Sequence, residues 1–151
     1  EITTRLVGSE MCIRDRSKPL LDRIDIFTET IILKYGEISN SDKGENSYNV
    51  RKRIEKVHHI QKERYKNDGI LFNSELSAGM IKRYCVMDNE AKEYLENIFE
   101  NMEFSARAYH KVLKTARTIA DMDESGEIKR KHISEAVCYR TADKKYWGVT
   151  M

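Results

Sequence analysis

Ser105-Ala-Arg-Ala-Tyr-His-Lys-Val-Leu-Lys-Thr-Ala-Arg-Thr-Ile-Ala-Asp121 is the stretch that decides the fold class. Its serine is a favourable helix N-cap, because the hydroxyl can accept a hydrogen bond from an unpaired N–H of the first turn. Apolar residues then recur three and four positions apart, which predicts a helix with one buried face. They are Tyr109, Val112, Leu113, Ala116, Ile119 and Ala120. The other side carries Arg107, His110, Lys111, Lys114 and Arg117, which we expect to face solvent.

Arg107 lies in the first turn of this predicted helix, where the helix dipole disfavours a cation by about 0.3–1 kcal/mol. Two interpretations are open at this point. In the first, Arg107 is a tolerated surface residue. In the second, the N–H groups of the helix start and the guanidinium form a site for an anion such as phosphate.

The composition indicates a helical protein with a highly charged surface: 151 residues, 40% hydrophobic and 34% charged, with a single proline. This length accommodates one domain. A net charge of +2 does not by itself indicate nucleic acid or a membrane as partner. No run of 18 apolar residues and no signal-peptide pattern is present, so no membrane association is expected. Cys12, Cys85 and Cys138 form no Cys-x-x-Cys pair, which favours reduced thiols and a cytoplasmic location.

The chain divides into four parts. Residues 1–16 follow neither a helical nor a strand period and stay unassigned. Within 17–33, residues 24–33 are rich in β-formers and predict a single strand that has no partner strand in this chain. Residues 34–48 are rich in Ser, Asn, Asp and Gly and predict a linker. Residues 49–148 predict an all-α module of about five helices.

The first helix of that module is predicted at about 49–66 and is strongly basic. Its apolar stripe consists of Val50, Ile54, Val57 and Ile60. Its outer side carries Arg51, Lys52, Arg53, Lys56, Lys62, Arg64 and Lys66. Such a side could contact nucleic acid, but the intervening glutamates and the near absence of aromatic residues favour a solvated surface. Further helices are predicted at about 73–84, after Asp88, at 105–121 and at about 132–139.

The segment 121–132 begins like a calcium-binding loop, but two positions contradict that interpretation. The closing position holds His132 instead of glutamate, and Lys129 stands where a ligand or water belongs. We therefore expect a connection between helices. The four histidines are interpreted as surface or boundary residues, and no metal site or nucleophile–base pair is predicted. The chain also lacks a Gly-x-x-x-x-Gly-Lys-[Ser/Thr] loop, so it should not hydrolyse ATP alone.

Several blocks, in this order, resemble the carboxy-terminal end of the magnesium-chelatase-like AAA+ ATPases of the ComM (YifB) type. The resemblance runs from about residue 17 to 148 and is most specific over 105–121. The blocks are Lys18-Pro-Leu-Leu-Asp-Arg-Ile-Asp-Ile26, a helix with Ile54, Val57, Gln61 and Arg64, Tyr84-Cys85, the 105–121 stretch, His132-Ile-x-Glu-Ala136 with Tyr139-Arg140, and Tyr146-Trp-Gly148.

The resemblance implies that residues 17–33 are the tail of an AAA+ core and that residues 49–148 are the helical lid. It implies that Arg23 is an arginine finger acting in trans on a neighbouring subunit's nucleotide. Arg107 matches the sensor 2 arginine, which reaches the γ-phosphate of its own subunit, with Ser105 in the same nucleotide-binding block. Both guanidiniums would stabilise charge on the transferring phosphoryl group.

For the full-length parent, the resemblance implies ATP and Mg²⁺ as cofactors and a homo-oligomeric ring, expected to be a hexamer. This fragment alone is expected to bind neither cofactor. The implied function couples ATP hydrolysis to DNA remodelling by branch migration in competence and recombination. The alternative is a helical adaptor without nucleotide chemistry, which binds DNA or protein through helix 49–66 and Lys111 and Lys114.

The chain departs from the family pattern at two places. Lys18 stands where the family usually has glycine before the Pro-Leu-Leu-Asp-Arg block. Residues 1–16 match neither the Walker motifs nor the sensor 1 strand expected upstream, and they resemble a peptide that recurs at the ends of unrelated predicted proteins. We therefore interpret them as a non-native leader, and the chain as a truncated gene product.

Overall fold

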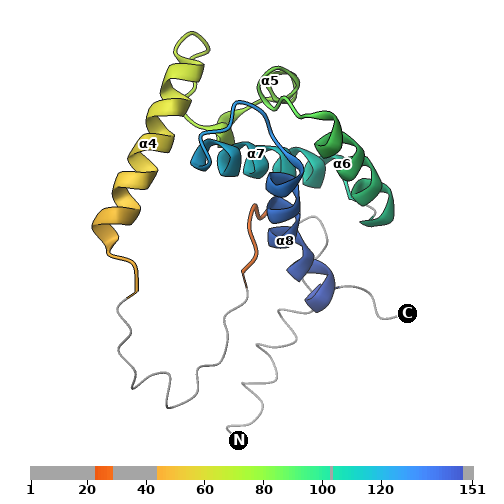
Figure 1. Ribbon diagram of the computed structural model, residues 1–151. Helices are drawn as coiled ribbons and strands as arrows, with labels where there is room; N and C mark the ends of the chain where they lie inside the picture. The colour runs from red at the N-terminus through yellow and green to blue at the C-terminus, as the bar shows by residue number, and fades with distance from the viewer. Residues whose placement is uncertain (1–22, 29–43, 103, 148–151) are drawn as a thin grey trace, which may run out of the picture.

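The computed structural model describes residues 23–28, 44–102 and 104–147, with the backbone alone for 141–147. The fold is mainly helical, as the sequence predicted (Figure 1). Its elements are α4 (Ser47–Tyr65), the short 3-10 helix η1 (Asn73–Glu75), α5 (Ala78–Tyr84), α6 (Asn89–Met102), α7 (Ala106–Met122) and α8 (Arg130–Trp147).

The strand expected at 24–33 is not found where the structure can test it. Residues 24–28 are described and form no paired strand, and residues 29–33 lie outside the described part. The described ranges contain no strand elsewhere either. Helix α8 is also longer than the predicted 132–139 segment, because it continues to Trp147.

Side-chain caps fix the starts of several helices. The Ala108 N–H donates to the Ser105 hydroxyl at 3.1 Å, which confirms the predicted start of α7. The Ala91 N–H donates to the Asp88 carboxylate at 2.7 Å, and α6 follows as predicted. Each cap satisfies an N–H that the helix itself leaves unpaired.

Helix α7 is the centre of the molecule. It packs against α8, α4, η1 and α5, while α6 packs against α8. Figure 1 shows α7 between these elements. Its predicted apolar face is confirmed, since Val112, Ala116 and Ala120 have no exposed surface. The other buried apolar residues packed in this core include Tyr65, Leu76, Ile81, Leu95, Ile128, Ile133 and Val137.

A short backbone pairing ties the α5–α6 connection to the loop between α7 and α8. Met87 and Ile128 form a parallel bridge. The Ile128 N–H donates to the Val86 carbonyl at 2.8 Å, and the Asp88 N–H donates to the Ile128 carbonyl at 3.2 Å. Ile128 is fully buried, so this loop is part of the core.

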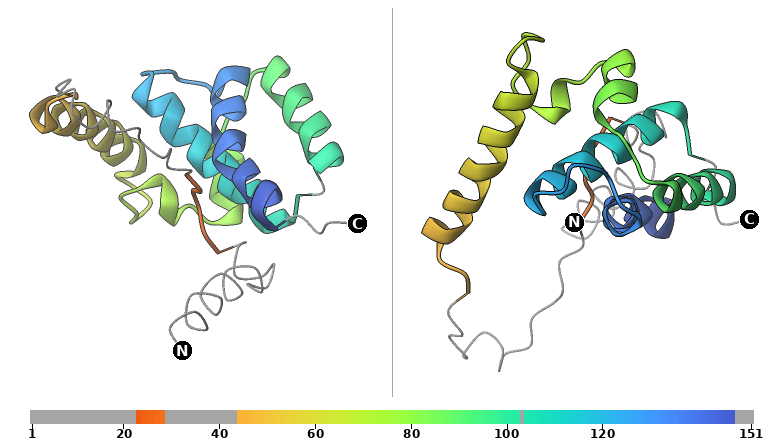
Figure 2. Two further views of the ribbon diagram at one scale, coloured as in Figure 1. Left: turned by 90° about the horizontal axis from the view of Figure 1, so that it is seen from below. Right: turned by 45° about the horizontal axis from the view of Figure 1, so that its top comes forward.

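Helix α4 contacts the rest of the module mainly with its second half. Its buried residues are Val57, Gln61 and Tyr65. Of its first ten residues, 47–56, only Val50 is partly buried. Ile54, predicted to lie on the buried stripe, is 39% exposed. Both figures show the first half of α4 leading away from the other helices (Figures 1 and 2).

Candidate functional site

A cavity of about 680 Å³ lies where α7, α8 and the 23–28 segment meet. It brings together residues from distant parts of the chain. Its cationic and titratable lining consists of Arg23, Asp25, Arg107, His110, Lys111, Lys114 and Glu135. The remaining lining is Ile26, Ser74, Thr115, Thr118, Ile119, Met122 and Tyr139. One arginine comes from each of the two blocks that the sequence analysis singled out for phosphate chemistry.

Arg107 is placed in this cavity by the start of α7. The Ser105 cap fixes the first turn, and Arg107 is the exposed second residue of the helix. No acidic residue stands in that first turn. The positive end of the helix dipole and the guanidinium therefore act in the same region, which favours an anion. Ser105, the other predicted nucleotide-binding residue, does not line the cavity and acts on the helix start instead.

Arg23 reaches the same cavity because the 23–28 segment packs across α7 and α8. Lys111 of α7 donates to the Arg23 carbonyl at 2.7 Å and also contacts the Asp25 carboxylate. The Phe27 N–H donates to the Tyr139 carbonyl of α8 at 2.9 Å. The structure thus brings Arg23 and Arg107 to one cavity, although 84 positions separate them in sequence.

Lys111 and Lys114, predicted to face solvent, are both engaged within the molecule. Only 15% of the Lys111 side chain is exposed in its contact with Asp25. The Lys114 ammonium donates to the Ser74 carbonyl at 2.8 Å. These contacts leave less of the two cations available to an external partner than the sequence suggested.

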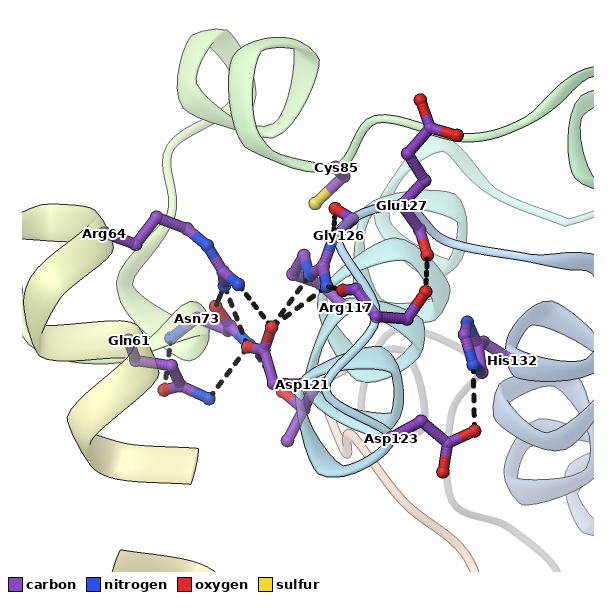
Figure 3. A network of polar contacts seen from close by, with 12 residues as sticks. Gln61, Arg64, Asn73, Cys85, Arg117, Asp121, Asp123, Gly126, Glu127 and His132 are labelled. Atoms are coloured by element: carbon purple, nitrogen blue, oxygen red, sulfur yellow. Dashed lines mark hydrogen bonds and ion pairs between the residues drawn. The ribbon is translucent and has the colours of Figure 1, made fainter. Parts of the chain in front are cut away.

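A polar network joins α4, η1 and α7, and it was not predicted from the sequence (Figure 3). Asp121 is its centre and has no exposed side-chain surface. Its carboxylate accepts from Arg64 Nη1 at 2.8 Å, from Arg117 Nε at 3.1 Å and from Asn73 Nδ2 at 2.9 Å. The Gln61 amide donates to it at 3.3 Å.

The predicted surface position is therefore wrong for two arginines, Arg117 and Arg64. Arg117 is 1% exposed, and its guanidinium also donates to the Gly126 carbonyl at 2.8 Å. Arg64 turns inward from α4. Burial is the largest single effect and opposes its charge, but the hydrogen bonds to Asp121 and Tyr65 and the charge interactions with both together outweigh burial and raise the Arg64 pKa. Charged groups can be buried in this way when every partner is present.

His132 is more buried than the surface or boundary position predicted for it, since it is 1% exposed. Its Nδ1 accepts from the Lys129 N–H at 3.0 Å, and its Nε2 lies 3.1 Å from the Asp123 carboxylate (Figure 3). Because Nδ1 accepts, the proton of the neutral ring is on Nε2. This bonding fixes the start of α8. Asp121 and Asp123 are thus engaged in contacts with basic side chains, and we find no group of three or more metal-ligating side chains among the described residues.

Cys85 shows no sign of nucleophilic activation. Burial raises the pKa of the Cys85 thiol to about 11. Its Sγ lies 3.8 Å from the Leu113 carbonyl, inside the core. The thiol therefore stays protonated at neutral pH and acts as a small core residue.

The comparisons with known proteins agree on one family. A family model described as "Magnesium chelatase, subunit ChlI C-terminal" matches residues 44–140. The chain is similar to the uncharacterized protein YifB of Salmonella typhimurium, with 37% identity over 129 residues that cover 85% of this chain and 25% of that protein. It is also similar to the competence protein ComM of Haemophilus influenzae, with 38% identity over 125 residues, 82% of this chain and 24% of that protein.

A further relative is the YifB protein of Escherichia coli, 35% identical over 129 residues, with 85% of this chain and 25% of that protein covered. The chain thus spans about a quarter of the length of these curated relatives. Among the described residues, no helix has the length and apolar character needed to cross a membrane.

Proposed function

This chain belongs to the magnesium chelatase ChlI C-terminal family as a carboxy-terminal fragment, and we propose that it is the helical lid of a ComM-like AAA+ ATPase. In this proposal the full-length protein forms a cytoplasmic ring, a hexamer, that hydrolyses ATP with Mg²⁺. It applies that energy to DNA in recombination and competence; of this role, the name of the relative, "Competence protein ComM", supports only the competence part. The fragment contributes to the site and does not hydrolyse ATP by itself.

The observation that supports this proposal is the presence of Arg23 and Arg107 in one cavity. The lining includes two arginines, two lysines and two carboxylates, so formal positive charge is in excess. A phosphoryl group carries negative charge on several oxygens, and guanidiniums bind such groups with paired hydrogen bonds. The cavity therefore suits the phosphate end of a nucleotide held by the core of the parent protein.

In the proposed mechanism, Arg107 is the sensor 2 residue and Arg23 is the arginine finger. Each guanidinium stabilises the charge that develops on the transferring phosphoryl group. Because the 23–28 segment packs on α7 and α8, the guanidiniums of Arg23 and Arg107 contact the same phosphate chain in this mechanism. This differs from the division implied by the resemblance, in which Arg107 serves its own subunit's nucleotide and Arg23 serves the neighbour's.

The decisive experiment replaces Arg107 by alanine in the full-length parent. We expect ATP turnover to fall by roughly 10²–10³-fold, the typical effect of removing one transition-state donor. Ring assembly, followed by light scattering, should be unchanged because Arg107 is exposed. The matched control is Lys92→Ala, which removes an exposed cation of α6 that does not line this cavity. Normal turnover in Arg107→Ala would refute the sensor assignment.

The alternative function, a DNA- or protein-binding adaptor, has less support from the structure. Lys111 and Lys114 are engaged with the 23–28 segment and with Ser74. On α4, Arg53 forms a two-point ion pair with Glu45, with both contacts at 3.0 Å. Salt-dependent DNA binding by this chain would favour the adaptor, because phosphate contacts release counterions. Absence of DNA binding at low salt would leave the DNA-binding form of the adaptor without support.

A further inference from the structure

The 23–28 segment makes specific contacts with two basic residues that lie on different helices. Lys111 of α7 holds the carbonyl of Arg23 and the carboxylate of Asp25. Arg140 of α8 donates to the Ile24 carbonyl, and its guanidinium carbon lies 5.3 Å from the centre of the Phe27 ring. Four of the six described residues in the segment are therefore contacted by one or the other.

Burial of the two basic residues makes these contacts more effective than ordinary surface pairs. Arg140 is 3% exposed, and the Lys111 side chain is 15% exposed. Hydrogen bonds from charged donors are stronger than hydrogen bonds between neutral groups. This advantage becomes smaller when water competes for the donor. Of the apolar residues of the segment, Ile26 is 50% exposed, whereas Ile24 and Phe27 are partly buried. The polar contacts therefore act together with this partial apolar burial in holding the segment.

We propose that Lys111 and Arg140 are positioning residues that hold the 23–28 segment on the helical module and thereby set the place of Arg23. Lys111 fixes the backbone of Arg23 directly, through its carbonyl oxygen. Arg140 fixes the neighbouring residue Ile24 in the same way. Because α7 also carries Arg107, one helix sets the relative position of both cavity arginines. The role of Arg23 in catalysis rests on the proposed function, whereas the docking of the segment does not.

The Phe27 amide gives a direct test, because its hydrogen bond to the Tyr139 carbonyl forms only when the segment is docked. Hydrogen exchange at this amide can be followed by NMR in the chain as it stands. Lys111→Ala should speed its exchange about tenfold, the size expected for losing a charge-assisted hydrogen bond. Amides inside α7 should keep their wild-type rates.

Two further variants separate docking from general destabilisation. Asp25→Asn changes a side chain of the segment that is 69% exposed. It should speed exchange of the Phe27 amide without altering the packing of the core. Lys111→Arg keeps a cationic donor and should restore most of the protection. The matched control is Lys114→Ala, on the same helix and in the same cavity, whose contact is the Ser74 carbonyl. Its Phe27 amide should exchange as in the wild type.

The positioning role is overturned if the wild-type Phe27 amide exchanges as fast as an unstructured one. It is equally overturned if Lys111→Ala leaves that rate unchanged, or if Lys114→Ala accelerates it to the same extent. In the full-length parent, Lys111→Ala should lower kcat more when Arg23 is present than in an Arg23→Ala background, where only the loss of the Lys111 charge itself remains. If Arg23→Ala itself has normal kcat, the finger assignment fails, while the exchange data still decide the docking.

Discussion

The carboxylate of Asp121 lies 2.8 Å from the Nη1 of Arg64, although 57 positions separate the two residues in the chain. Asp121 has no exposed side-chain surface, and Arg64 is 18% exposed. This contact links α4 to the end of α7. Since a buried charge without its partner is strongly unfavourable, the stability of the module depends on both residues.

Asp121→Asn should lower the free energy of unfolding by about 3–5 kcal/mol, because it leaves the Arg64 and Arg117 guanidiniums without their carboxylate. Urea denaturation followed by circular dichroism measures this change. The control is Glu124→Gln, in which an exposed carboxylate 3.9 Å from Lys56 is neutralised. A loss in Asp121→Asn as small as the roughly 0–1 kcal/mol of exposed ion pairs would contradict the buried-network interpretation.

Arg64→Ala should loosen α4 selectively, since the arginine joins that helix to Asp121 and lies 3.4 Å from the Asn73 side-chain oxygen. Hydrogen exchange should accelerate over residues 57–65 more than over α8. Exchange mass spectrometry can compare the two helices in one sample. Lys62→Ala, an exposed residue of the same helix, is the control. Equal acceleration of α4 and α8 would mean that the variant only weakens the whole fold.

Thiol labelling should distinguish the described cysteines. Cys138 is exposed and should react with a maleimide at pH 7, while buried Cys85 should react only after unfolding. The raised pKa of Cys85 also predicts that stability falls as pH rises from 9 towards 11, because the unfolded thiol ionises first and the folded one resists. Peptide mapping by mass spectrometry, and urea denaturation at pH 8 and 10.5, measure the two effects. Cys85→Ala should remove its part of the pH dependence; rapid labelling of Cys85 at pH 7 would contradict its burial.

Mixed rings of two inactive full-length variants test whether the cavity arginines serve one nucleotide. If one chain supplies both to the same site, then mixing Arg23→Ala with Arg107→Ala subunits leaves every site short of one guanidinium, and ATP turnover stays low. The shared cavity predicts this result. If the two act at different nucleotides, some sites in the mixed ring regain both groups. Recovery of turnover above that of either variant alone would therefore favour the division implied by the resemblance.

The sequence predicted the helices well because their signals are local. The caps at Asp88 and Ser105 and the apolar spacing of α7 depend on neighbours within a few positions. The polar interior was missed for the opposite reason. Periodicity assigns charged residues to the surface, and only the four-residue spacing of Arg117 and Asp121 hinted at a pair. The inward turn of Arg64 depends on a partner far away in the chain.

The 23–28 segment also shows that the sequence does not reveal contacts between distant parts of the chain. Its β-rich residues suggested a strand, but a strand forms only where backbone partners are available. Within the described part of the chain, the backbone of the segment hydrogen-bonds from Phe27 to Tyr139, and the segment also contacts side chains of α7 and α8. The sequence blocks did select Arg23 and Arg107. Their shared cavity became visible only with the packing of that segment.

The one-sided attachment of α4 makes this helix a lever. It has 19 residues, so at a rise of about 1.5 Å per residue it is about 28 Å long. Its pivot is the Asp121 contact near its last turn, and its first half is mostly exposed, with Lys56 lying 3.9 Å from Glu124. For a helix of this length, a tilt of about 10° at the pivot would displace the far end by about 5 Å. The chain that continues from the 23–28 segment joins α4 at that far end, where the leverage is greatest.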